Sequence, residues 1–408
     1  MLRHLRHQSV PTVLRGPILL DAGGLPRYWA SVWLIVFAGD LAATTRLKKL
    51  RAIEALYQHA EASEGRNRLD DALASLDDTS LSAILESWFV SICNRSERRE
   101  ADELRWRAGL DFVRSIFECL ATVRSSDADL VGIERRLHRL KTLYRQLHVR
   151  RSTSTESIRS LPANTVESLY AMLDPSAAEG SPLVRVNARW RTYIAFVLML
   201  HQGLRRGELL LLQADCIKSA IDEQRGLRRY WINVRNDDDE SAELDPRHSR
   251  PSLKNAGSVR QLPVSELTAT LVQTYTENYR GRPNHPYLLN SQGDRPFSTE
   301  SLTKLFALVS THLPSSVRRE LEDRTGKRSI TPHDLRHTCA VVRLQQLLSS
   351  GDSMDEALQK MRSFFGWSRA STMPSLYARA VFEDRLAGIW NNAFDERVNL
   401  VRALPRTH

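Results

Sequence analysis

Cysteine is scarce in this chain of 408 residues, and the few that occur are scattered. No two of them form a Cys-x-x-C pair, and none has a nearby histidine at a spacing that would hold zinc. A zinc site is therefore not predicted, and we expect buried free thiols in a reducing compartment. The four cysteines are Cys93, Cys119, Cys216 and Cys339.

Long apolar runs are also missing. The most apolar early segment runs from Tyr28 to Gly39 and ends at Asp40, whereas a membrane-spanning helix needs about 20 apolar residues. The basic start, Met1 to His7, has no apolar segment behind it, which argues against a secretory signal. The sequence predicts a soluble, intracellular protein with no membrane partner.

Positive charge is what the chain has in excess. It has 58 Lys and Arg residues against 48 Asp and Glu, a formal net charge of +10 and a pI near 9.6. This balance favours a polyanionic partner such as nucleic acid. With 42% apolar residues over 408 positions, the chain has enough for two domains and an additional N-terminal element.

Apolar periodicity predicts a mainly α protein with a small β-sheet. Two short apolar runs around an Asp-Ala-Gly-Gly turn predict an arm or hairpin within residues 1–44, and side chains three and four apart predict a helical bundle over 45–150. A Ser/Thr-rich linker covers 151–160, a second domain 161–390 and a C-terminal tail 391–408. Within the second domain we expect helices at 165–173 and 188–201, strands at 230–235 and 259–264, and helical segments from 298 onward.

Two charged segments are predicted from composition. The acidic run 237–245 has no regular ligand spacing, so we interpret it as a solvated loop and not as a metal site. A basic run near the end of the bundle has only Glu134 opposing it. Alone it would be a solvated face, but beside a phosphate-binding site it predicts a strip that binds the phosphate backbone of a nucleic acid. The strip consists of Arg135, Arg136, Arg139, Lys141, Arg145, Arg150 and Arg151.

Four separated motifs describe a phosphate-handling site. Residues 203–209 read Gly-Leu-Arg-Arg-Gly-Glu-Leu, and Lys254 lies before a turn and a strand that a basic residue enters. Residues 331–338 read Thr-Pro-His-Asp-Leu-Arg-His-Thr, and Gly366-Trp367 is followed by Tyr377. Because His333 and Arg336 are three apart on an expected helix, they share a face and converge on one anion.

In this order the motifs resemble the tyrosine recombinase family, the phage-integrase-like enzymes, over roughly residues 160 to 390. The resemblance implies an N-terminal helical core-binding domain followed by a mixed α/β catalytic domain. It also implies cleavage and rejoining of double-stranded DNA through a 3′-phosphotyrosyl intermediate, without metal ion, ATP or other cofactor. A homotetramer on DNA, accessory recombination proteins, a cytoplasmic, nucleoid-associated location and integration or excision of a mobile element are further implications.

The resemblance assigns the phosphate clamp to two arginines. Arg205 corresponds to the first catalytic arginine, with Arg206 as a neighbouring alternative, and Glu208 would orient the arginine or a neighbouring backbone group. Arg336 completes the clamp on the non-bridging oxygens. His333 would hydrogen-bond the phosphate and assist proton transfer.

The remaining roles follow the same correspondence. Lys254 would protonate the departing 5′ oxygen. Trp367 stands where most members have a second histidine, and its indole N–H can still donate one hydrogen bond. Tyr377 is the expected nucleophile, whereas His337 is expected to pack or hydrogen-bond locally. A type IB topoisomerase-like activity and a catalytically silent DNA-binding regulator remain as alternatives.

Overall fold

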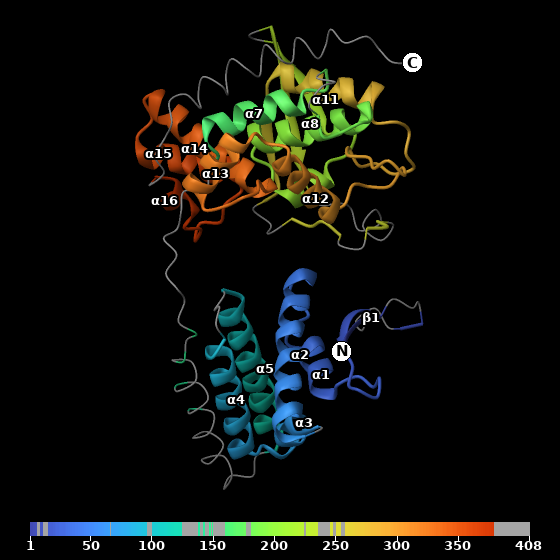
Figure 1. Ribbon diagram of the computed structural model, residues 1–408, viewed down its shortest axis with the longest axis vertical. Coiled ribbons are helices and arrows are strands. Elements are labelled where there is room, and N and C mark those ends of the chain that lie inside the picture. Colours follow the sequence, from blue (N-terminus) through green and yellow to red (C-terminus); the bar gives the residue numbers. More distant parts are fainter. Residues whose placement is uncertain are drawn as a thin grey trace. The chain divides into compact units, whose positions relative to one another are not determined.

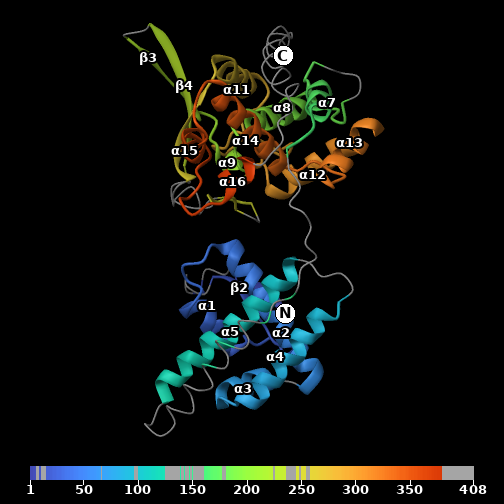
Figure 2. The same ribbon diagram turned by 90° about the vertical axis from the view of Figure 1, so that its left-hand side faces the viewer.

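The computed structural model of the chain divides into two compact units, Met1–Ser154 and Thr155–His408, shown in Figure 1 and, turned by 90°, in Figure 2. Helices dominate both units and the sheets are small, as the sequence predicts. Among the described residues, no helix is long and apolar enough to cross a membrane. The structure describes residues 1–5, 9–10, 15–65, 67–95, 100–124, 138, 142, 147, 149, 160–176, 181–223, 226–235, 245–247, 250–253 and 258–378.

Several predicted segments lie outside these residues. They are Lys254, all seven residues of the basic strip between Arg135 and Arg151, residues 237–244 of the acidic run, residues 151–159 of the linker and the chain beyond Ala378. The last acidic residue, Asp245, is described and is not solvated. It is buried in an ion pair with Arg247, whose guanidinium also donates to the carbonyl of Leu210.

The first unit is a helical bundle with a two-stranded antiparallel sheet at its start. β1 (Leu2–Leu5) pairs with β2 (Gly16–Leu19), and the described helices are α1 (Tyr28–Val36), α2 (Ala43–Glu64), α3 (Arg68–Ser75), α4 (Asp78–Cys93) and α5 (Glu100–Arg124). The segment expected as an arm or hairpin contains α1. Trp33 of this helix is buried in the same core as Trp88 and Trp106. The apolar run is too short to span a membrane, and it buries its apolar surface against the helical bundle.

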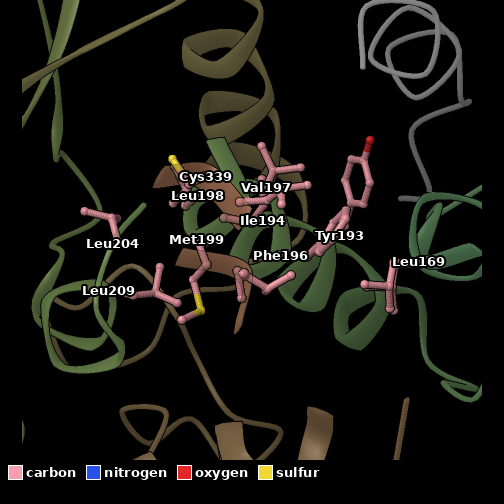
Figure 3. Close-up of a cluster of buried hydrophobic side chains, with 14 of the residues drawn as sticks. Leu169, Tyr193, Ile194, Phe196, Val197, Leu198, Met199, Leu204, Leu209 and Cys339 are labelled. Atoms are coloured by element: carbon pink, nitrogen blue, oxygen red, sulfur yellow. The ribbon is translucent and has the colours of Figure 1, made fainter. Parts of the chain in front are cut away.

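The second unit carries all the motifs and has its own hydrophobic core. α8 (Val186–His201) is buried along most of its length, and Figure 3 shows its side chains Ile194 and Leu198 in one cluster with Leu204 and Cys339. An all-round apolar helix is typical of the centre of a domain. The other described helices are α7 (Ala163–Leu173), α9 (Arg206–Leu211), α11 (Glu266–Asn278), α12 (Thr299–Thr311), α13 (Ser315–Thr325), α14 (Pro332–Ser349), α15 (Met354–Phe365) and α16 (Met373–Ala378).

A three-stranded antiparallel sheet completes this unit. Its order is β3 (Ile217–Asp222), β4 (Leu227–Val234) and β5 (Arg260–Val264), with Tyr230 opposite Val264. Ile232, Val234 and Leu262 point into the core, in the alternation expected of a half-buried strand. The sheet thus brings Arg260, at the start of β5, toward the helices that carry the motifs.

Candidate active site

The turn between α8 and α9 delivers Arg205. Gly203 has φ +58°, a left-handed conformation, and a Cβ at this position would lie 2.4 Å from Cε1 of Phe365 and 3.1 Å from Sγ of Cys339. The chain therefore turns here only because residue 203 has no side chain. Arg205 follows in extended conformation as the N-cap of α9, with its side chain 18% exposed.

Replacing Gly203 with alanine is expected to cost about 2–4 kcal/mol of unfolding free energy, because left-handed strain adds to overpacking. Gly226→Ala is the matched control: its φ is +63°, but a Cβ there meets no atom within 4 Å. The control should lose only the strain, about 1 kcal/mol. Urea unfolding followed by circular dichroism measures both, and equal losses would show that the contact with Phe365 is irrelevant.

Glu208 is the centre of the site. This carboxylate is 1% exposed and accepts hydrogen bonds from the guanidinium and the backbone N–H of Arg205. Arg260 donates to it twice, at 3.1 and 2.9 Å, and Arg336 lies 3.6 Å away as a third ion pair. Burial opposes ionisation of Glu208, but the hydrogen bond and charge of Arg260 and then the charges of Arg336 and Arg205 lower its pKa overall.

Arg336 is the most buried of the three arginines, at 2% exposed. It donates to the carbonyl oxygens of Gly203 and Phe365 and lies over the Phe365 ring at 4.9 Å. Burial and the neighbouring Arg205 lower the pKa of Arg336 to about 9, partly offset by Glu208, so the guanidinium stays charged at neutral pH. Three guanidiniums against one carboxylate give this group a net charge of three minus one, or +2.

Further hydrogen bonds join four segments of the chain around this group. Arg205 also donates to Oγ of Ser258 at 3.2 Å and to the carbonyl of Gly366 at 3.2 Å. Arg260 donates to the carbonyls of Ser258 and Phe364, each at 2.7 Å. The arginines of α9, β5 and α14 are thereby fixed relative to the turn that follows α15.

Tyr377 lies in α16 with 5% of its surface exposed. Its hydroxyl is hydrogen-bonded to Nδ1 of His337, and its ring stacks on Trp367 with centroids 5.4 Å apart and planes 13° apart. The charge of Tyr377 is also one of the influences that raise the pKa of Arg336. The hydroxyl is therefore within electrostatic reach of the arginine group.

The first turn of α14 places the two histidines. Thr331 is its N-cap, and the carboxylate of Asp334 accepts from the Thr331 backbone N–H at 2.8 Å, so this local sequence starts the helix. His333 is exposed, and its ring meets the buried ring of His337 edge-on at 4.2 Å. Positions 333 and 337 are four apart and thus lie on one helix face.

The structure brings Arg205, Arg336, Trp367 and Tyr377 into one region of the second unit, with His333 at its exposed edge. Lys254 lies outside the described residues. The segment that leads to it runs against α9, because a Cβ on Gly207 would lie 2.8 Å from the carbonyl oxygen of Ser252. Arg206, the neighbouring alternative, points elsewhere and donates to Oγ1 of Thr303 at 3.0 Å.

Sequence reasoning missed two contacts. In the sequence, Arg260 could be recognised only as a basic residue at the start of a strand. Nothing in the neighbouring residues indicates that it donates to Glu208, as Arg205 does. His337 was expected to pack or hydrogen-bond locally; it does pack locally, against His333, but the sequence did not indicate its hydrogen bond to Tyr377, 40 positions away. In the part of the chain that the structure describes, no group of three His, Cys, Asp or Glu residues could hold a metal ion.

Comparison with known proteins gives one family. The family model described as "Phage integrase family" matches residues 159–383. A solved structure, "Crystal structure of XerA recombinase", is similar at 16% sequence identity and a TM-score of 0.32, covering 84% of this chain and 98% of that chain. No curated protein matches the chain.

Proposed function

The chain belongs to the phage integrase family, the tyrosine recombinases, and we propose that it cleaves and rejoins DNA at specific sites through a 3′-phosphotyrosyl intermediate. The observation that supports this most directly is the cationic group around Glu208, whose Arg336 interacts electrostatically with Tyr377. A net charge of +2 in a largely buried site favours an anion, and the scissile phosphate of DNA is an anion that a phenol can attack.

In the proposed reaction Tyr377 attacks the phosphorus while Arg205 and Arg336 hold the non-bridging oxygens. Their guanidiniums are already fixed by Glu208 and by backbone carbonyls, so they need little reorganisation as negative charge develops. His333 donates to the phosphate from the exposed edge. Trp367 packs against the nucleophile, which restricts the orientations of its ring.

Lys254 is proposed to protonate the 5′ oxygen as it leaves, which gives a free 5′ hydroxyl and a covalent link to Tyr377. Attack by a 5′ hydroxyl of a partner strand then reverses the step and joins the strands. One phosphodiester is exchanged for another, so the reaction requires neither ATP nor a metal ion. Holding two duplexes in register calls for a homotetramer, with integration or excision of a mobile element as the outcome.

DNA binding is proposed for the basic strip of the first unit, the Arg and Lys residues between Arg135 and Arg151. Lys and Arg side chains that neutralise phosphates supply sequence-independent affinity. This affinity falls as the salt concentration rises. Accessory proteins would add to this binding on longer sites.

Covalent trapping tests the proposal. The full chain is incubated with duplex DNA that carries the element's own termini, 5′-labelled on the cleaved strand, in EDTA, and then analysed on a denaturing gel. We expect a shifted, protease-sensitive band whose tryptic peptide contains Tyr377. Intact binding without an adduct would identify a silent DNA-binding protein, whereas plasmid relaxation without strand exchange would identify a topoisomerase-like activity.

A further inference from the structure

His337 occupies a position that the proposed function leaves without a role. It is 1% exposed, follows Arg336 in α14, and hydrogen-bonds through Nδ1 with the hydroxyl of Tyr377. The ring of His333 covers another side of it at 4.2 Å. The group hydrogen-bonded to the hydroxyl of the proposed nucleophile is therefore this second histidine of the His-Asp-Leu-Arg-His sequence.

The direction of this bond follows from the tautomer of His337, and the proposed role requires the neutral imidazole that carries its proton on Nε2. A neutral imidazole accepts at one ring nitrogen, and a phenol with a pKa near 10 is the donor. A phenol attacks phosphorus poorly until its proton is removed, so a base is needed on the hydroxyl at the moment of attack. The charge of Arg336 interacts with that of Tyr377 and thereby favours the phenolate.

We propose that His337 is a catalytic residue of the proposed DNA cleavage, which orients Tyr377 and accepts its phenolic proton. As the bond between Oη of Tyr377 and phosphorus forms, the phenolic proton passes to Nδ1 of His337. The bond between phosphorus and the 5′ oxygen breaks, and its electron pair leaves with that oxygen, which takes a proton from Lys254. Religation returns the proton from His337 to Tyr377. This inference rests on the proposed function.

The same unit contains a second hydrogen-bonded pair of a tyrosine and a histidine, which serves as a structural comparison. Tyr170 of α7 hydrogen-bonds through its hydroxyl to Nε2 of His201 in α8, and both side chains are buried. Burial and the charge of Arg343 lower the pKa of His201 to about 3. The two pairs differ in their surroundings, since Tyr377 stacks on Trp367 and interacts with the arginine group.

The test compares His337→Asn with His201→Asn as the matched control. Asparagine retains an acceptor of similar position without the basicity of imidazole. In single-turnover cleavage of a nicked suicide duplex, His337→Asn is expected to be slower by about 10²- to 10⁴-fold, the usual loss for a general base. His201→Asn should cleave at the wild-type rate, although it removes the Nε2 atom that is hydrogen-bonded to another buried tyrosine, Tyr170.

Two further readouts separate a base from a packing residue. Ring-fluorinated tyrosine incorporated at position 377 has a more acidic phenol, so it should reduce the defect of His337→Asn by about tenfold or more. A substrate with a 5′-bridging sulfur needs no proton on its leaving group, so it should rescue Lys254→Ala and leave His337→Asn slow.

The outcomes are distinct. Cleavage by His337→Asn at the wild-type rate, or a defect that neither changes with fluorination nor exceeds that of His201→Asn, would overturn the role of His337. Absence of an adduct with the wild-type chain on correct termini would overturn the proposed function itself. Fluorinated Tyr377 that restores cleavage in His337→Asn supports both.

Discussion

Tyr377→Phe is expected to bind DNA and to form no covalent adduct, a loss of at least ~10⁴-fold in cleavage, because no other group replaces a missing nucleophile. Phenylalanine retains the ring that stacks on Trp367 and loses only the hydroxyl bonded to His337. The stability cost should therefore be about 1 kcal/mol, the usual net value of one hydrogen bond. Denaturing gels measure the adduct, and gel shift measures binding.

Tyr170→Phe is the matched control for this experiment. It removes the hydroxyl that is bonded to His201, a second buried tyrosine and histidine bond in the same unit. The control should lose a similar amount of stability and still form the adduct. An adduct with Tyr377→Phe at the wild-type level would mean that another residue is the nucleophile.

Glu208→Gln is expected to destabilise the second unit by about 3–5 kcal/mol, because the substitution leaves buried guanidiniums without a counter-charge. At about 2–4 °C per kcal/mol for a unit of this size, the melting temperature falls by roughly 6–20 °C. Glutamine preserves the side-chain volume and one acceptor oxygen, so the loss of stability measures the contribution of the negative charge. Thermal unfolding measures it, and Glu322→Gln, in an exposed pair with Arg328, should change stability by less than about 1 kcal/mol.

The same carboxylate gives an acid dependence. The folded-state pKa of Glu208 lies below its ordinary value of 4.5, because the three arginines outweigh burial. A lowered carboxyl pKa contributes stability that is present above 4.5 and is lost as pH falls through the folded value. The stability difference between wild type and Glu208→Gln should therefore shrink as the pH falls below 4.5. A difference that stays constant in acid would argue against an ionised Glu208.

The parts of the site that depend on local sequence were predictable. The Thr-Pro-His-Asp segment starts α14 through bonds between residues three apart, and the apolar run before Gly203 predicts α8. Family resemblance gave Arg205, Arg336 and Tyr377 their proposed roles. The geometry then adds that Arg205 and Arg336 lie on one carboxylate.

The parts that depend on packing were not predictable from one sequence. The bond of Arg260 to Glu208 joins residues 52 positions apart, and it exists only because β5 pairs with β4. The bond of His337 to Tyr377 depends in the same way on how α16 packs against α14. β3 and α11 were missed as well. The alternation in β3 is weak, and its register comes from pairing with β4.

The joining of four segments around Glu208 has a consequence for the order in which the protein is made. Arg205, Arg260 and Arg336 all precede Tyr377 in the chain, so every arginine of the group around Glu208 is synthesised before the proposed nucleophile. A nascent chain that ends before α16 lacks the proposed nucleophile. A finished chain with a misfolded β5 lacks the third guanidinium on Glu208. The proposed breakage of DNA, a reaction that is hazardous when left incomplete, would thereby be restricted to molecules whose second unit has folded correctly.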